Sequence, residues 1–294
     1  MADIMQQIEM AYPKFSKGQK LIAAYIREHF DKAAFMTAAK LGTTVGVSES
    51  TVVRFATEIG YDGYPQLQRA LKEIVRNRLT SVQRMEVTND RLWGSDVLGK
   101  VLRMDMDTIR RTLEETDREA FYEAVAQIMD AKKIYIMGIR SAASLAGFLY
   151  YYFNHIFEDV RNMDTASSSM IFEQMLRLDS GDVFIGISFP RYSKRTLKAA
   201  TYAKSCGAKV IAITDSHSAP LAQLADYVLV AKSDIASFVD SVVAPLSLIN
   251  ALIVAIGLEK KEEIAETYDK LEHIWGEYGV YQHNGDQEGR DEDV

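Results

Sequence analysis

Hydroxyl groups and arginines gather in two short segments that each follow a run of apolar residues. Residues 138–144 (GIRSAAS) follow the apolar residues 134–137, and residues 188–196 (SFPRYSKRT) follow residues 183–187. If each segment opens a helix, the backbone N–H groups of its first turn and the side-chain donors beside them attract an anion. We therefore predict an anion site whose contacts are Arg140, Ser141, Ser188, Arg191, Ser193 and Thr196.

Five apolar runs predict the sheet that would bring these segments together. The runs 134–137, 183–187, 210–213 and 227–230 are continuous, and residues 160–164 form a weaker candidate. Continuous apolar runs with helical stretches between them are typical of buried parallel strands covered by helices. The expected C-terminal fold is a three-layer α/β sandwich with a five-stranded parallel sheet, flavodoxin-like, in strand order 2-1-3-4-5.

Ligands bind at the carboxyl ends of the strands in such a sheet, which is where both segments and the shorter segment 214–216 would lie. A plainer interpretation stays open for each residue taken singly. Ser141 and Ser193 would then be helix N-caps, and the arginines would be solvated. The same chemistry in two segments at one sheet edge favours the anion site.

The N-terminal part of the chain carries the pattern of a helix-turn-helix. Thr37 is suited to cap a short helix, Gly46 to adopt the positive φ of a tight turn, and Ser48 to cap a second helix that ends at Gly60. The spacing of Val52, Val53, Ala56 and Ile59 predicts the stripe of this second helix that faces a core.

The opposite side of that helix carries Ser50, Thr51 and Arg54, whose side chains can reach base edges or phosphates when the helix lies in the major groove. A three-helix packing unit without a DNA role shows the same pattern. Net charge favours DNA, because residues 1–78 carry +3 and the rest of the chain carries −10. The basic part is the part that would meet phosphate.

Length and composition limit the remaining possibilities. A chain of 294 residues suits two domains, which we place at 1–78 (helix-turn-helix) and 132–258 (α/β domain). Residues 79–131 form the linker and connecting helices, and residues 259–294 a helix and an acidic tail. Ser95 is suited to cap a helix that carries residues 97–102.

The same composition predicts a cytoplasmic protein without a membrane span, a metal or another cofactor. We expect no transmembrane helix and no signal peptide, because no run of about 18 apolar residues occurs and the N-terminus lacks a basic start. The single cysteine, Cys206, rules out an internal disulfide, and the five histidines are scattered without metal-ligand spacing.

Three blocks of the N-terminal part, residues 36–41 (MTAAKL), 47–56 (VSESTVVRFA) and 59–67 (IGYDGYPQL), resemble the helix-turn-helix domain of the RpiR/MurR family of bacterial transcriptional regulators. The resemblance runs from about Phe15 to Leu71. In that family the Val-Ser-x-x-Thr-Val-x-Arg-Phe segment is the recognition helix. The resemblance implies that DNA is contacted by Thr37, Lys40, Ser48, Ser50, Thr51 and Arg54.

Residues 132–256 resemble a sugar isomerase (SIS) domain. The resemblance lies in the Gly-x-x-Ser turn after the first strand, in the serine-containing segment after Ile187, and in residues 218–229 (SAPLAQLADYVL). SIS domains bind phosphosugars, and in RpiR-type regulators this domain senses the effector and dimerises. The resemblance therefore implies an anionic sugar or sugar phosphate as effector and a homodimer or homotetramer.

The phosphate segment departs from the usual SIS pattern, which reads Ser-x-Ser-Gly-x-Thr. Ser188 and Ser193 match the first and last positions, but Pro190 replaces the middle serine and Arg191 replaces the glycine. The first segment lacks its usual second glycine and carries Arg140. Two arginines beside one anion site indicate a ligand with more negative charge than a simple phosphosugar, or with a carboxylate.

The leading hypothesis is a DNA-binding regulator without enzyme activity, whose dimer places two recognition helices about one DNA turn apart on double-stranded operator DNA. The alternative is a phosphosugar isomerase or lyase, which needs a base near the substrate carbon. The candidate segments offer no Glu or His, and the nearest carboxylates are Asp215 and Asp234. A structural adaptor with a degenerate helix-turn-helix is a third possibility.

Overall fold

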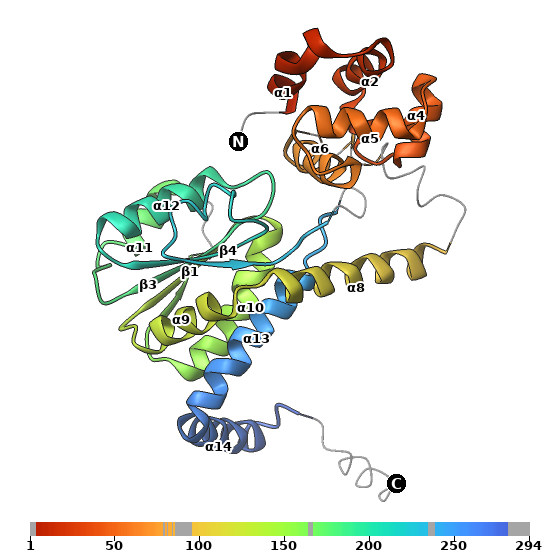
Figure 1. Ribbon diagram of the computed structural model, residues 1–294. Coiled ribbons are helices and arrows are strands. Elements are labelled where there is room, and N and C mark those ends of the chain that lie inside the picture. The colour runs from red at the N-terminus through yellow and green to blue at the C-terminus, as the bar shows by residue number, and fades with distance from the viewer. Residues whose placement is uncertain are drawn as a thin grey trace, which may run out of the picture. The chain divides into compact units, whose positions relative to one another are not determined.

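The computed structural model describes residues 4–78, 80, 82–83, 85, 96–163, 167–234 and 239–281. Contacts divide the chain into two compact units (Figure 1). The first contains Met1–Met106 and Asp234–Ser241, and the second contains Asp107–Ser233 and Val242–Val294. Most of the expected linker, with Ser95, and the acidic tail from Gln282 lie outside the described residues.

The N-terminal unit is all-helical up to residue 78. Its elements are α1 (Ile4–Ala11), a 3-10 turn (Tyr12–Lys14), α2 (Lys17–Glu28), α3 (Phe30–Ala33), α4 (Ala38–Val45), α5 (Glu49–Glu58) and α6 (Tyr64–Arg78). Their apolar faces meet in one core, in which Ile22, Leu41, Phe55 and Leu67 are fully buried.

The predicted caps of the helix-turn-helix are confirmed. The Thr37 hydroxyl accepts a hydrogen bond from the Lys40 N–H at 3.1 Å, and the Ser48 hydroxyl accepts one from the Thr51 N–H at 3.3 Å. Gly46 ends α4 at φ +74° and Gly60 follows α5 at φ +95°. Both glycines therefore supply the left-handed conformation that ends a helix.

One part of the predicted core stripe of α5 is wrong. Val53 is 40% exposed, whereas Val52, Phe55, Ala56 and Ile59 are buried. Successive residues of a helix are about 100° apart, so a stripe through positions 52, 56 and 59 includes position 55 and turns position 53 outward. The Phe55 ring packs against the Phe15 ring of the chain before α2, with 5.1 Å between ring centroids.

The C-terminal unit contains a five-stranded parallel sheet in the order β2-β1-β3-β4-β5, as predicted. The strands are β1 (Ile134–Gly138), β2 (Val160–Asn162), β3 (Val183–Ile187), β4 (Lys209–Thr214) and β5 (Tyr227–Val230). The helices are α8 (Val97–Glu115, whose first part belongs to the other unit), α9 (Arg118–Met129), α10 (Ser141–Ile156), α11 (Ser168–Gln174), α12 (Lys194–Ser205), α13 (Val243–Glu259) and α14 (Lys261–Glu277).

Helices cover both faces of this sheet and make the expected three layers (Figure 1). On one face, Ile134 and Ile136 of β1 pack in a core with α9, α10 and α13. On the other face, Tyr135 and Met137 pack in a core with α11 and α12. Because both faces are buried, β1 and β3 are apolar without alternation, whereas the edge strand β2 carries Arg161 and Asn162.

Helix α8 begins at Val97 and carries the expected residues, whereas Ser95, its predicted cap, lies outside the described residues. The Asp96 carboxylate accepts a hydrogen bond from the Gly99 N–H at 2.8 Å.

In the described part of the chain no single helix has the length and apolarity to cross a membrane. Helices α13 and α14 meet that criterion only as a pair, and they are bent by 99° relative to each other.

Candidate functional site

Three hydroxyl groups cluster at the start of α5, the predicted recognition helix. The Ser48 hydroxyl lies 2.9 Å from the Ser50 hydroxyl and 2.9 Å from the Thr51 hydroxyl. One turn further along α5, the Arg54 Nε donates to the Ser50 carbonyl at 3.3 Å, and Arg54 is exposed. The structure therefore brings four of the six predicted DNA contacts to one exposed patch.

A polar hollow of about 510 Å³ lies beside this patch. It is lined by Val47, Ser48, Thr51 and Arg54 and by three residues that the sequence did not single out, namely Ser16, Gly18 and Gln19. Ser16 caps α2 in a capping box with Gln19. Two helix N-termini, those of α2 and α5, thus adjoin one concave surface, and N-terminal N–H groups favour anions such as DNA phosphates.

Two glycines allow the close packing of this region. A Cβ on Gly18 would lie 3.2 Å from Val47 Cγ1, and a Cβ on Gly42 would lie 2.8 Å from the Val47 carbonyl oxygen. The second distance is shorter than real Cβ contacts allow. Gly42 is therefore required for the turn between α4 and α5 to come this close to α4.

The remaining two predicted contacts, Thr37 and Lys40, are exposed at the start of α4 and do not line the hollow. The segment that leads into α4 is fixed from α6. The Tyr64 hydroxyl donates to the Met36 carbonyl at 2.8 Å. Burial raises the pKa of Tyr64 to about 12, so the hydroxyl keeps its proton.

In the C-terminal unit, strand register places the three candidate loops at one edge of the sheet. Gly138 at the end of β1 pairs with Ile187 at the end of β3, and Ile187 pairs with Ile213 of β4. The loops that follow these strands therefore leave the sheet next to one another. This confirms the topological argument, whereas the individual ligand contacts stay predictions.

The loop after β1 is short and leads directly into α10. Arg140 holds the N-cap position and Ser141 is the first helical residue, so the interpretation of Ser141 as an N-cap is wrong. Both residues are exposed. The loop is tight because β1 passes close to α10: a Cβ on Gly138 would overlap the Ala142 carbonyl group.

The loop after β3 is fixed by hydrogen bonds to its own helix and to β4. Ser193 caps α12 by accepting from the Thr196 N–H at 3.3 Å, and the Ser193 N–H donates to the buried Ser188 hydroxyl at 3.3 Å. The Thr214 hydroxyl donates to the Ser188 carbonyl at 2.7 Å. Thr196 is fully buried, and its hydroxyl has no hydrogen-bond partner within the described structure.

Both loops contain an arginine in the left-handed region. Arg140 has φ +62° and Arg191 has φ +65°, and the other described residues with positive φ are glycines. An L-residue with a Cβ is disfavoured there by about 1–2 kcal/mol. Non-glycine residues persist in such conformations mainly at functional positions.

Sequence reasoning missed a polar network at the same sheet edge. The Tyr192 hydroxyl donates to the carboxylate of the buried Asp215 at 2.9 Å. Beyond β5, the Lys232 ammonium donates to the Asp215 carbonyl at 3.4 Å and pairs with Glu115 of α8 at 2.6 Å. Asp215 follows a predicted strand, which was the available signal, but Tyr192 and Lys232 reach it only through the fold.

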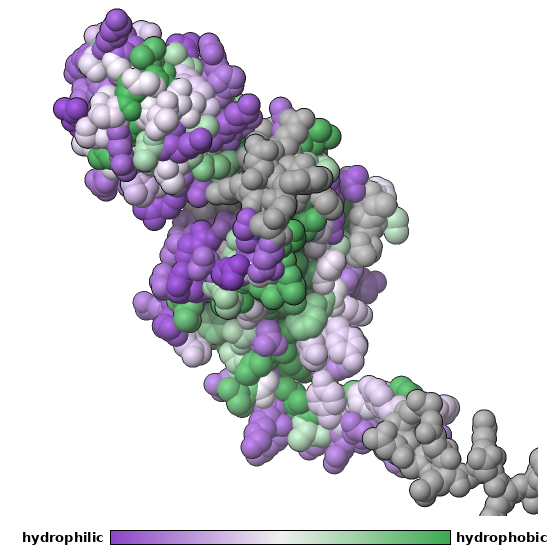
Figure 2. Space-filling model, turned by 90° about the vertical axis from the view of Figure 1, so that its right-hand side faces the viewer, coloured by the Kyte–Doolittle hydropathy of each residue, from purple (hydrophilic) through white to green (hydrophobic). Residues whose placement is uncertain are grey.

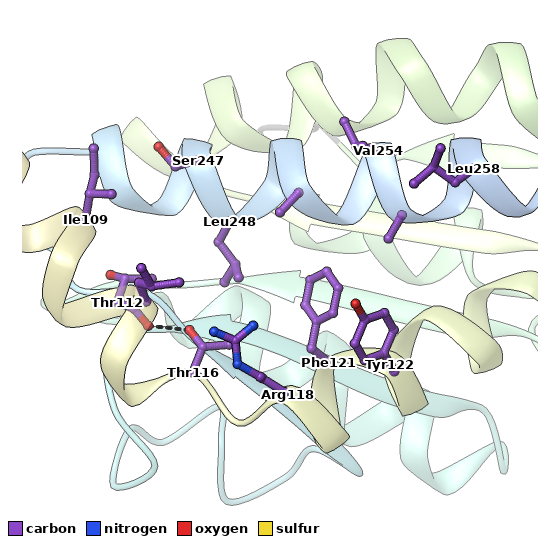
Figure 3. A pocket seen from close by; sticks show the side chains of 13 residues that line it. Ile109, Thr112, Thr116, Arg118, Phe121, Tyr122, Ser247, Leu248, Val254 and Leu258 are labelled. Atoms are coloured by element: carbon purple, nitrogen blue, oxygen red, sulfur yellow. Dashed lines mark hydrogen bonds between the residues drawn. The ribbon is translucent and has the colours of Figure 1, made fainter.

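A separate apolar cavity of about 420 Å³ lies away from these loops, between α8, α9 and α13 (Figure 3). Phe121 and Tyr122 of α9 point toward α13, and Leu248 of α13 points toward α9 in this view. Hydrophobic side chains also gather on one face of the C-terminal unit (Figure 2). Among the residues that line the cavity, Leu113, Tyr122, Val254 and Leu258 are 52–72% exposed.

Comparison with known proteins matches each of the two parts of the chain to a protein family. The model of the helix-turn-helix domain of the rpiR family matches residues 2–78, and the model of the SIS domain matches residues 127–255. An uncharacterised HTH-type transcriptional regulator of Clostridium perfringens is 28% identical over 228 residues, which cover 77% of this chain and 80% of that protein.

Two solved structures share the fold. The sugar isomerase domain of an RpiR transcription factor from Sphaerobacter thermophilus covers 61% of this chain and 99% of its own, with 26% identity and a TM-score of 0.57. The NanR protein of Vibrio vulnificus, solved with ManNAc-6P, covers 95% of this chain and 100% of its own, with 20% identity and a TM-score of 0.59.

A DNA-binding helix-turn-helix domain joined to a SIS domain is the architecture of a transcriptional regulator. This chain joins a helix-turn-helix domain of the rpiR family to a SIS domain.

Proposed function

We propose that this regulator binds double-stranded operator DNA through α5 and that its SIS domain senses a sugar phosphate. The observation that carries the proposal is that each unit presents hydroxyl donors at the start of a helix with an arginine within the first two turns. In the N-terminal unit these donors are exposed beside a polar hollow, and in the C-terminal unit they lie at the carboxyl edge of a parallel sheet.

The DNA role rests on the exposed side of α5. Ser50 and Arg54 are exposed, and the N-termini of α2 and α5 can both accept phosphate beside the hollow. In this arrangement Arg54 is the side chain with the reach and the planar donors to contact a base edge. Thr37 and Lys40 would contact the DNA backbone from the start of α4.

The DNA role is tested with duplexes selected from a random pool and measured by fluorescence anisotropy over a range of salt concentrations. We expect Arg54→Ala to weaken binding roughly tenfold or more, as loss of a base-contacting arginine does. The matched control is Arg27→Ala, which removes an equal charge from the other end of α2, where Arg27 faces Glu9. Equal effects of the two substitutions would contradict the assignment of α5.

The effector role rests on the loops after β1 and β3. Three hydroxyl residues lie at the first turn of α12, namely the buried Ser188 and Thr196 and the capping Ser193. Backbone N–H groups and hydroxyls at this turn could donate hydrogen bonds to a phosphate group. The structurally similar NanR protein was solved with ManNAc-6P, which is a sugar phosphate. Binding of such an effector regulates DNA binding only if its affinity differs between the two states of the protein.

We propose that the SIS domain binds its sugar phosphate without converting it to a product. The buried carboxylate at this sheet edge, Asp215, accepts a hydrogen bond from Tyr192, which suits a structural role. Incubation of the full chain with each sugar phosphate that binds, followed by NMR of the ligand, tests this point. Unchanged ligand together with altered DNA affinity is the expected result, and formation of an isomer would support the enzyme alternative.

The chain also needs a second copy if it reads a two-fold operator. We propose that the partner copy covers the apolar face formed by α8, α9 and α13. Helix α13 is apolar on most of its circumference, with Ser247 and Asn250 as polar residues before Glu259, yet Val254 and Leu258 remain exposed on it. A helix of this kind is normally buried, so an apolar surface of a partner is expected to pack against it.

Sedimentation equilibrium tests the proposed interface and separates a dimer from a tetramer. We expect Leu258→Glu to shift the protein toward monomer. The control is Leu176→Glu, because Leu176 is 76% exposed but follows α11 on the opposite face of the sheet. A monomeric wild-type protein, or an equal effect of both substitutions, would overturn this interface.

A further inference from the structure

The conformation of Arg140 and Arg191 carries information about the ligand. Both residues adopt positive φ in adjacent loops, at +62° and +65°, where glycine would fit without strain. Neither position needs a side chain to build the turn, since the other left-handed residues of the described chain are glycines. Two strained arginines at one sheet edge therefore indicate that their guanidinium groups have a function.

Cationic residues stand at the start of both helices that open at this edge. Neither α10 nor α12 has an acidic residue in its first turn, whereas α5 begins with Glu49 and α9 has Glu119. Helix α12 instead begins with Lys194 and Arg195. Cations at a helix N-terminus oppose the helix dipole, so the free protein is electrostatically unfavourable here until anions bind.

The donors of this edge fall into two kinds. Ser188 and Thr196 are buried hydroxyls at the first turn of α12, and the Thr196 hydroxyl has no partner among the described residues, which suits a phosphate held against the helix. Arg140, directly before α10, and Arg191, within the loop after β3, are exposed. A guanidinium group presents a planar pair of N–H donors that matches a carboxylate.

Resting on the proposed function, we propose that the effector is a phosphorylated sugar acid. Its phosphate binds at the first turn of α12, and its carboxylate binds Arg140 and Arg191. The arginines thereby select acids over neutral sugar phosphates.

Isothermal titration of the full chain with matched ligand pairs tests this selectivity. The pairs are glucose 6-phosphate with gluconate 6-phosphate, and ribose 5-phosphate with ribonate 5-phosphate, and unphosphorylated gluconate is added alone. We expect at least one acid to bind ten times more tightly than its neutral partner, and gluconate to bind more weakly than its phosphate.

Glycine variants separate a ligand role from a structural role. Arg140→Gly and Arg191→Gly remove the guanidinium and relieve the backbone strain, so we expect a Tm equal to or above that of the wild type. The ratio of acid to neutral affinity should fall toward one in both variants. The control is Lys198→Gln, which removes an exposed charge from α12 one turn beyond Lys194 and should leave the ratio unchanged.

The possible outcomes distinguish selectivity for acids, phosphosugar sensing and a purely structural role of the arginines. Equal binding of acids and neutral sugar phosphates would overturn the selectivity and leave the phosphosugar sensor in place. Failure of every phosphorylated ligand to bind would overturn the sensor itself. A lower Tm in the glycine variants, with an unchanged affinity ratio, would show that the arginines serve the fold.

Discussion

The two candidate sites use the same donors but differ in the residues that turn the backbone beside them. In the N-terminal unit, the left-handed positions around α4 and α5 are Gly46, Gly60 and Gly63. In the C-terminal unit, the left-handed positions of the two ligand loops are Arg140 and Arg191. In the candidate DNA site, glycines therefore make the turns and other residues are placed for contact. In the candidate ligand loops, arginines occupy the turn positions and are also the proposed contacts.

This difference shows how far each site tolerates substitution. A turn made by glycine has no strain to relieve, so any replacement with a Cβ costs stability. A turn made by arginine carries strain that glycine would relieve, so replacement costs function instead. Substitutions at Gly138, Gly46 and Val53, with decreasing expected effects on stability, test this contrast.

The largest effect is expected at Gly138, at the end of β1. A Cβ there would overlap the Ala142 carbonyl, which is backbone and cannot move aside. We expect Gly138→Ala to destabilise the C-terminal unit by about 3 kcal/mol and to displace the start of α10 with Arg140. Thermal unfolding and ligand titration measure the two effects. Gly147→Ala in the same helix is the control, because a Cβ there meets no atom within 4 Å, and it should be neutral or stabilising.

A smaller effect is expected at Gly46. A Cβ there meets no atom within 4 Å, so only the left-handed backbone opposes Gly46→Ala. The expected cost is about 1 kcal/mol in the unfolding of the N-terminal unit. Gly46→Ala should therefore lower the Tm, whereas Arg191→Gly should leave the Tm unchanged or raise it. If both substitutions lowered the Tm equally, the contrast between the two sites would not hold.

The smallest effect on stability is expected at Val53, which is exposed on α5 beside Arg54. Its methyl groups are suited to contact a thymine methyl in the major groove. We expect Val53→Ala to leave the Tm unchanged and to weaken binding to the selected sequence by roughly 1 kcal/mol, about fivefold, through lost apolar contact. Anisotropy with duplexes that carry uracil in place of thymine identifies the base. A wild-type protein that does not distinguish the duplexes would contradict this contact.

Much of the fold could be predicted because it depends on local patterns. Apolar runs marked the strands, and short connections with crossover helices restricted the sheet order. The caps at Thr37 and Ser48 followed from side chains that reach their own backbone within three residues. The predicted core stripe of α5 wrongly included Val53 and omitted Phe55. The Phe55 ring packs against Phe15, some 40 residues earlier in the chain, which the local pattern does not show.

Local patterns along the chain predict the two-part architecture and the residue types at each candidate site. Only the tertiary structure decided which of those residues share a surface. It brought the start of α2 beside α5, linked Tyr192 and Lys232 to Asp215, and gave Arg140 and Arg191 their left-handed backbone. The physical reason is that caps and strands arise from neighbours along the chain, whereas these contacts join residues that are distant in sequence or fix a backbone angle that the residue type alone disfavours.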